Sequence, residues 1–162
     1  MSEKDLSALF LDTLKDIYYA EKQIYKALPK MAKAASSDQL RNAFEKHHDE
    51  TEEHIERLEK VFDLLGKPAR GKKCEAIEGI IDEGKEIMDE YQDAPALDAG
   101  LIAAAQAVEH YEISRYGTLK SWAEKLSMNE AMKLLDQTLA EEKKTDDTLS
   151  KIAVSAVNAE AA

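Results

Sequence analysis

The sequence predicts an all-α fold: a four-helix bundle of two antiparallel hairpins, joined by a long crossover that carries an extra short helix. Glycine and proline are scarce, at six and three of 162 residues, whereas an all-β protein needs many tight turns. Polar breaks fall near residues 36–38, 66–71 and 93–95. Between these breaks, apolar residues recur every three or four positions, which is the period of an amphipathic helix.

The first predicted hairpin consists of helices at residues 4–35 and 38–65. Because the turn between them is short, the two helices should be antiparallel. Each helix has an inward stripe with steps of three or four residues. The stripes are Phe10, Leu14, Ile17, Glu21, Ile24, Leu28 and Met31 in the first helix, and Phe44, His47, Thr51, His54, Leu58, Val61 and Leu65 in the second.

The second predicted hairpin consists of helices at residues 96–126 and 128–157, and the crossover carries a helix at 74–91. Ser127 and Glu130 have the spacing of a capping box, which predicts Ser127 as an N-cap. The inward stripes are Leu101, Ala105, Val108, Glu112, Arg115, Leu119, Trp122 and Leu126, and then Leu135, Thr138, Glu142, Thr145, Leu149, Ile152 and Ala156.

Length and composition limit the domain count and the function class. We expect one domain over residues 1–157 and a frayed tail at 158–162. With 22 basic and 33 acidic residues the net charge is −11. This charge argues against nucleic acid and anionic membranes as partners, and it suits cations.

The single cysteine, Cys74, excludes an internal disulfide framework and a cysteine-rich zinc site. A chain with one cysteine fits a reducing compartment. The N-terminal residues have no long apolar segment, and no apolar run approaches the roughly 20 residues of a membrane span. We therefore expect a cytoplasmic protein without membrane association.

Several acidic residues occupy positions where the helical pattern requires an apolar side chain. Glu21, Glu112 and Glu142 each interrupt an inward stripe, and Glu109 lies one turn before Glu112. Glu50 borders the stripe of its helix, with a histidine one turn to either side. These residues lie near the midpoints of four helices, so antiparallel packing should bring them to a common layer.

A cluster of buried carboxylates needs either protons or cations, because an unpaired buried charge costs several kcal/mol. Two divalent or trivalent metal ions would neutralise four or five carboxylates, and oxygen with imidazole ligands suits iron or manganese, with zinc as an alternative. A lone stripe glutamate is more often a boundary residue, and a lone histidine a hydrogen-bonded core residue. Convergence from four helices favours metal binding instead. The candidate ligands are Glu21, His47, Glu50, His54, Glu109, Glu112 and Glu142.

Three tyrosines lie at helical spacing from these acids. Tyr18 and Tyr25 flank Glu21, and Tyr116 follows Glu112 by one turn. Their expected role is packing, with the hydroxyl bonded to a carboxylate. Oxidation beside a redox metal is the alternative. The acidic run that includes Glu141 is expected to be solvated, except for Glu142.

Several segments resemble the YciF/YciE stress proteins, over about residues 6–152. The most specific is the segment from Val108 to Ile113, and the segments around Glu21, His47, Cys74 and Glu142 support it. The resemblance implies a bacterial, cytoplasmic, ferritin-like bundle with an added helix, related to the rubrerythrins and other di-iron proteins. It further implies a homodimer.

The sequence departs from the Glu-x-x-His motif that is usual in those wider relatives. Glu53 follows Glu50 by three residues, and Thr145 follows Glu142 by three. His47 and His54 lie on the same face of the helix at 38–65 and could substitute for the missing histidine. The helix at 128–157 contains no histidine, and the one further candidate it offers is Asp146, one turn after Glu142.

Two hypotheses of function follow. The first is a dinuclear iron or manganese carboxylate protein of the stress response, with ferroxidase or peroxidase-type activity. The second is a non-enzymatic dimeric protein, metal-binding or structural, in which the metal neutralises the core and adds its binding energy to folding.

Overall fold

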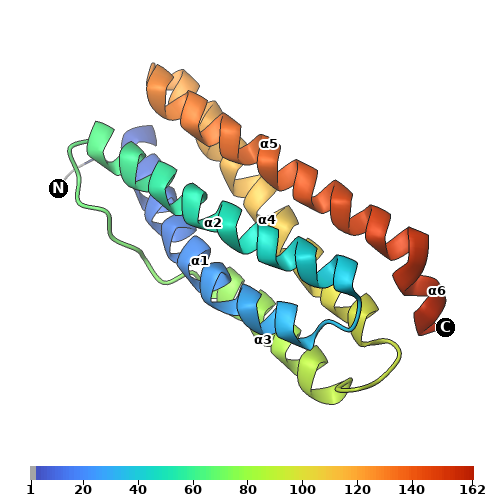
Figure 1. Cartoon of the computed structure of the whole chain (residues 1–162). Coiled ribbons are helices and arrows are strands. Elements are labelled where there is room, and N and C mark those ends of the chain that lie inside the picture. The colour runs from blue at the N-terminus through green and yellow to red at the C-terminus, as the bar shows by residue number, and fades with distance from the viewer. Residues whose placement is uncertain (1–2) are drawn as a thin grey trace.

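The computed structural model describes residues 3–162 and confirms the all-α prediction (Figure 1). The bundle helices lie close to the predicted ranges because their apolar period is unbroken between the polar turns. Within residues 3–162 there is no β-strand. The helices are α1 (Leu6–Ala34), α2 (Asp38–Leu64), α3 (Glu75–Glu90), α4 (Leu97–Lys125) and α5 (Asn129–Ile152), followed by a π-helical turn η1 (Ala153–Val157) and α6 (Asn158–Ala161).

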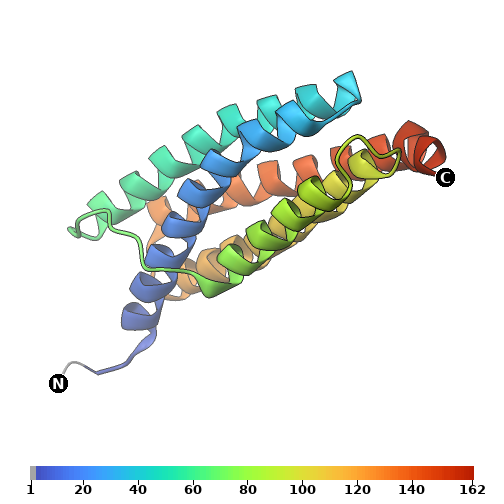
Figure 2. The ribbon, with the colours of Figure 1, turned by 90° about the horizontal axis from the view of Figure 1, so that it is seen from below.

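The two hairpins pack against one another to form the bundle. Helix α1 packs on α2, α4 packs on α5, and the contacts of α2 with α5 and of α1 with α4 close the bundle. Helix α3 lies along α4 and α1, on the side seen from below in Figure 2. Its apolar residues Ile77, Ile80, Ile81 and Ile87 pack on the core, so α3 covers one side of the bundle.

Side chains cap three of the helices. Asp5 accepts a hydrogen bond from the amide of Ala8 at 2.9 Å and Ser37 from that of Leu40 at 3.2 Å. The sulfur of Cys74 does the same for α3 through the Ile77 amide at 3.4 Å. Such caps satisfy amides that have no partner within the helix.

The prediction that Ser127 forms a capping box is wrong. Helix α5 begins at Asn129 without a side-chain cap. Ser127 instead has a φ of +58°, and its amide donates to the carbonyl of Glu124 at 3.1 Å. A left-handed residue after the last turn is a common way to end a helix, so Ser127 terminates α4.

A buried carboxylate connects the two hairpins at one end of the bundle. Asp98, in the first turn of α4, accepts hydrogen bonds from the amides of Ser36 at 2.8 Å and Ser37 at 2.7 Å. These amides belong to the turn between α1 and α2. The register between the hairpins is therefore fixed by polar contacts as well as by packing.

The inward stripes are buried as expected in α1, whereas α4 differs in its second half. Tyr116 and Ala123 are fully buried there, while Arg115 and Trp122 are half-buried. Helix α4 contacts α1, α3 and α5, so its buried face is wider than a single stripe. The tail, expected to fray, is helical through Ala161. None of the described helices is long and apolar enough to cross a bilayer.

Candidate metal centre

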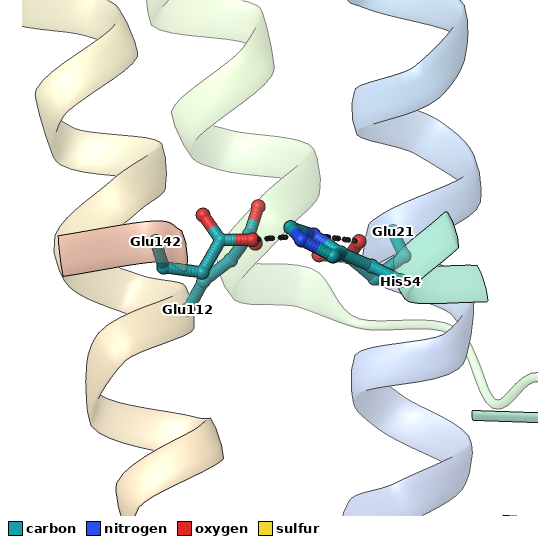
Figure 3. Close-up of side chains that lie close together, drawn as sticks. All are labelled: Glu21, His54, Glu112 and Glu142. Carbon is teal, nitrogen blue, oxygen red and sulfur yellow. Dashed lines mark ion pairs between the residues drawn. The ribbon is translucent and has the colours of Figure 1, made fainter. Parts of the chain in front are cut away.

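Six of the seven predicted ligands converge at the centre of the bundle, in two groups. The first group takes one residue from each bundle helix, and one possible ligand atom from each lies within 4.8 Å of all the others (Figure 3). Its members are Glu21 of α1, His54 of α2, Glu112 of α4 and Glu142 of α5.

The second group lies beside the first and shares one residue with it. It consists of His47 of α2, Glu109 of α4 and again Glu142, with ligand atoms within the same 4.8 Å limit. Glu142 is thus the common residue of both groups. All six side chains are buried, and the most exposed, His47, has an accessible fraction of 4%.

The histidines make the closest contacts in each group. Nδ1 of His54 lies 2.8 Å from Oε1 of Glu142 and 3.5 Å from Oε2 of Glu21. Nε2 of His47 lies 2.6 Å from Oε1 of Glu109. These approaches are not aligned as hydrogen bonds, since none of the carboxylate oxygens or ring nitrogens of the six residues has a hydrogen-bond partner within residues 3–162.

Unpaired polar atoms at this density need a physical explanation, because buried polar groups are almost always hydrogen-bonded. Carboxylate oxygens and imidazole nitrogens are both ligands of transition-metal cations. The six residues therefore form a buried cluster of acidic and histidine side chains that could hold a metal ion.

The electrostatics show how the cluster behaves without a cation. Burial raises the pKa of Glu109 and Glu112 well above the ordinary value, and the charges of Glu142 and Glu21 add to this. Burial lowers the pKa of His54, but contacts with Glu142 and Glu21 outweigh it and raise the pKa to about 10. Protons then supply the balancing positive charge.

Glu142 behaves in the opposite way. Burial by itself would raise its pKa, but polar contacts with Glu109, Glu112 and His54 outweigh burial and lower the pKa below the ordinary value. Glu142 therefore carries the negative charge that its neighbours stabilise, which suits a residue shared by two cation sites.

The structure does not bring Glu50 into either group. Its side chain is 22% exposed and lies 3.7 Å from Nζ of Lys46, while the hydroxyl of Thr145 donates to it at 3.4 Å. At 100° per residue, position 50 lies about 60° from the His47 direction, whereas position 54 returns to within about 20° of it. The two residues of α2 that belong to the groups are therefore His47 and His54.

One residue near the cluster was not anticipated. Oε1 of Glu141 lies 3.5 Å from Nε2 of His54, and Oε2 accepts from the Arg57 guanidinium at 2.7 Å. Glu141 is 24% exposed, so it is only partly solvated and contacts the cluster through His54. The pair joins α2 to α5, and such a contact leaves no periodic signal in either helix alone.

Two of the predicted tyrosines pack away from the cluster. The hydroxyl of Tyr18 donates to Glu59 at 3.0 Å, and the ring of Tyr25 stacks on His48 with centroids 4.1 Å apart. The expected role, packing with the hydroxyl bonded to a carboxylate, is confirmed for Tyr18, and packing is confirmed for Tyr25.

Tyr116 and Asp146 have different environments. Tyr116 is fully buried, and burial with the charges of Glu21, Glu112 and Glu142 raises its pKa. Its hydroxyl has no hydrogen-bond partner in the described part of the chain. Asp146 lies outside both groups, 3.2 Å from Nε2 of His110.

Comparison with known proteins gives one family. The family described as "Domain of unknown function (DUF892)" matches residues 5–162. The protein YciF of Escherichia coli strain K12 is 44% identical over 162 residues, covering 99% of this chain and 98% of that protein.

Solved structures give the same result. The crystal structure of the E. coli stress protein YciF has a TM-score of 0.91 at 44% identity, covering 96% of this chain and 99% of that one. YcfI from Rhodopseudomonas palustris, described as a proposed structural protein, has a TM-score of 0.88 at 46% identity over 91% and 94% of the two chains. A Xanthomonas campestris protein at 20% identity shares the fold, with a TM-score of 0.75 over 96% and 94% of the chains.

Proposed function

The chain belongs to the DUF892 family, and we propose that it is a dinuclear metal carboxylate protein of the bacterial stress response. The proposal is supported most by the unpaired oxygens and nitrogens of six buried side chains at one point of the bundle. The relative YciF is described as a stress protein, which supports the physiological setting.

Each group of the cluster would hold one ion. Glu21, His54 and Glu112 would bind the first ion, His47 and Glu109 the second, and Glu142 both. The four carboxylates carry four negative charges when ionised, which balances two divalent cations. The ligand set suits iron first, then manganese, with zinc also compatible.

The surrounding residues keep the centre dry. Ile17 and Ile24 lie one turn to either side of Glu21, and Leu58 lies one turn beyond His54; all three are buried. Iron bound there would supply redox chemistry for oxidation of ferrous ion by oxygen or hydrogen peroxide. The chain's own acids would release their protons on loading and take them up again on metal loss.

Elemental analysis and a reactivity assay test this function. We expect about two metal atoms per chain in protein purified from its native host, and fewer in Glu21→Ala and Glu142→Ala with helix content retained. Glu130→Gln, an exposed acid of the same helix as Glu142, is the matched control. Unchanged metal content in both alanine variants would refute the site.

The redox part has its own test. The protein is loaded anaerobically with ferrous iron and then mixed with hydrogen peroxide. A change in absorbance and loss of peroxide are expected, and both should disappear in Glu142→Ala. If metal binds but neither change occurs, the oxidoreductase function is excluded.

A second candidate is a non-enzymatic metal-binding or structural protein. The R. palustris relative is described as a proposed structural protein, and the buried acids give a metal a stabilising role that needs no reaction. This candidate predicts metal binding and loss of stability on chelation, but no consumption of peroxide.

We also propose that the protein is a cytoplasmic homodimer, as its resemblance to the stress proteins implies. Sedimentation equilibrium should give a mass near twice that of one chain. A mass of one chain at micromolar concentration would exclude a stable dimer.

A further inference from the structure

A cavity of about 190 Å³ lies between α1, α3 and α4, and the proposed function does not use it. Its wall includes Ile24 of α1, Ile80, Ile81 and Met88 of α3, and Val108 of α4. Protein interiors rarely contain voids larger than a water molecule. An apolar cavity of about 150 Å³ is enough to hold benzene, so this one has room for a body of the size of one aromatic ring.

The candidate metal centre contributes two residues to the wall of this cavity. His47 and Glu109, the members of the second group that are not shared with the first, both line it. Both side chains are more than nine-tenths buried, and their polar atoms lack hydrogen-bond partners within residues 3–162. A molecule in the cavity would therefore lie next to the second group and not the first.

The exposed residues of the lining are all lysines. Lys26, Lys30 and Lys85 line the cavity and are exposed. In the described part of the chain, no carboxylate lies within 4.0 Å of the amine of Lys26 or Lys30. The amine of Lys85 has one acidic neighbour, Asp82, at the long distance of 4.0 Å. Glu109 is the single acidic lining residue. In a chain of net charge −11, a lining whose exposed residues are all lysines favours an anion.

We propose that this cavity binds a small amphiphilic monocarboxylate, with an apolar body of about one ring between α1, α3 and α4 and its carboxylate at the lysines. One part of this inference, that such a molecule is a substrate of the metal centre, rests on the proposed function. Binding to the cavity itself requires no metal and is measured separately.

Methionine methyl groups report on binding directly. The probe is 3-phenylpropionate, and its uncharged counterpart is 3-phenyl-1-propanol. Met31 and Met88 line the cavity, whereas Met128 and Met132, at the junction of α4 and α5, do not. In protein labelled with ¹³C-methyl methionine, both metal-free and loaded with diamagnetic zinc, the acid should shift the Met31 and Met88 signals and leave Met128 and Met132 unchanged.

Variants test the wall and the lysines separately. Ala104→Leu adds apolar volume at the wall and should weaken binding about tenfold, whereas exposed Ala103→Leu on the same helix should not. The double variant Lys26→Gln/Lys30→Gln should weaken binding of the acid about fivefold, leave that of the alcohol unchanged and match wild type in helix content. Lys33→Gln, an exposed lysine of α1 outside the cavity, is the control.

The outcomes separate this inference from the metal function. Absence of Met31 and Met88 shifts at millimolar acid, or equal binding of acid and alcohol, overturns the inference even when metal is bound. Binding of the acid at Met31 and Met88 in a protein that takes up no metal supports the cavity site and refutes the metal centre instead.

Discussion

Loading the metal-free protein with a divalent cation should release protons in a countable amount. The cluster is buried and acidic, so without metal its charge is balanced by protons. A metal ion binds ionised carboxylates and neutral imidazoles. Loading at neutral pH must therefore expel the protons that the ligands hold.

The pKa shifts set a lower limit on this amount. The pKa values of Glu109 and Glu112 are raised well above the ordinary range by burial and by the neighbouring acids, and that of His54 is raised to about 10. His54 therefore holds a proton at neutral pH, and the raised pKa values of Glu109 and Glu112 favour their protonated forms. The pKa of Glu142 is lowered, so Glu142 contributes none. Filling both groups should release at least one proton per chain, from His54, and more to the extent that Glu109 and Glu112 are protonated.

Calorimetric titration measures this number. Zinc, which has no redox chemistry of its own, is titrated into metal-free protein in several buffers that differ in ionisation enthalpy. The slope of the observed enthalpy against buffer enthalpy is the number of protons released. Glu50→Gln is the matched control, since Glu50 lies outside both groups, and its slope should equal that of the wild type.

Two results would refute the reasoning. A slope near zero with tight zinc binding would show that the ligands are already deprotonated, and that the charges of the cluster are balanced in another way. A reduced slope in Glu50→Gln would show that Glu50 takes part in the site.

The metal-free protein should lose stability as pH rises from about 6.5 to about 10, because the pKa of His54 is about 10 in the folded chain against 6.5 unfolded, and the raised pKa values of Glu109 and Glu112 act in the same direction. Thermal melts in chelator should show this decline, and a flat profile would contradict it. Asp98→Ala should lower the free energy of unfolding by about 2–3 kcal/mol in urea denaturation, since two backbone amides lose a charged acceptor; a change below experimental error would show that water replaces the carboxylate. Glu141→Gln should weaken zinc binding about tenfold in competition with a chelator, because Glu141 contacts the second ring nitrogen of His54. The same affinity in Glu141→Gln and Glu130→Gln would exclude this orienting role.

The helices could be predicted from sequence because each is long, strongly periodic and bounded by polar turns. The ends of the helices were harder to predict. Ser127 has both the residue type and the spacing of an N-cap, yet it adopts a positive φ to end α4. Local spacing cannot distinguish these two uses of a serine between adjacent helices.

The centre of the cluster could also be anticipated, because Glu21, Glu112 and Glu142 replace apolar residues within a stripe and all three are fully buried. Glu50 shows the limit of this reasoning. It lies at the edge of its stripe, and a rotation of about 60° about the helix axis is enough to turn it from the core to the flank. The role of Glu141 could not be predicted, because it depends on a contact between two helices: Glu141 of α5 pairs with Arg57 of α2.

The sharing of Glu142 has a consequence for how this centre can change over evolutionary time. A substitution at Glu21 removes a member of one group only, whereas a substitution at position 142 removes a member of both. The two halves therefore cannot diverge freely. A descendant could lose Glu21 and keep the other half intact, but any descendant without Glu142 would have to rebuild both halves together.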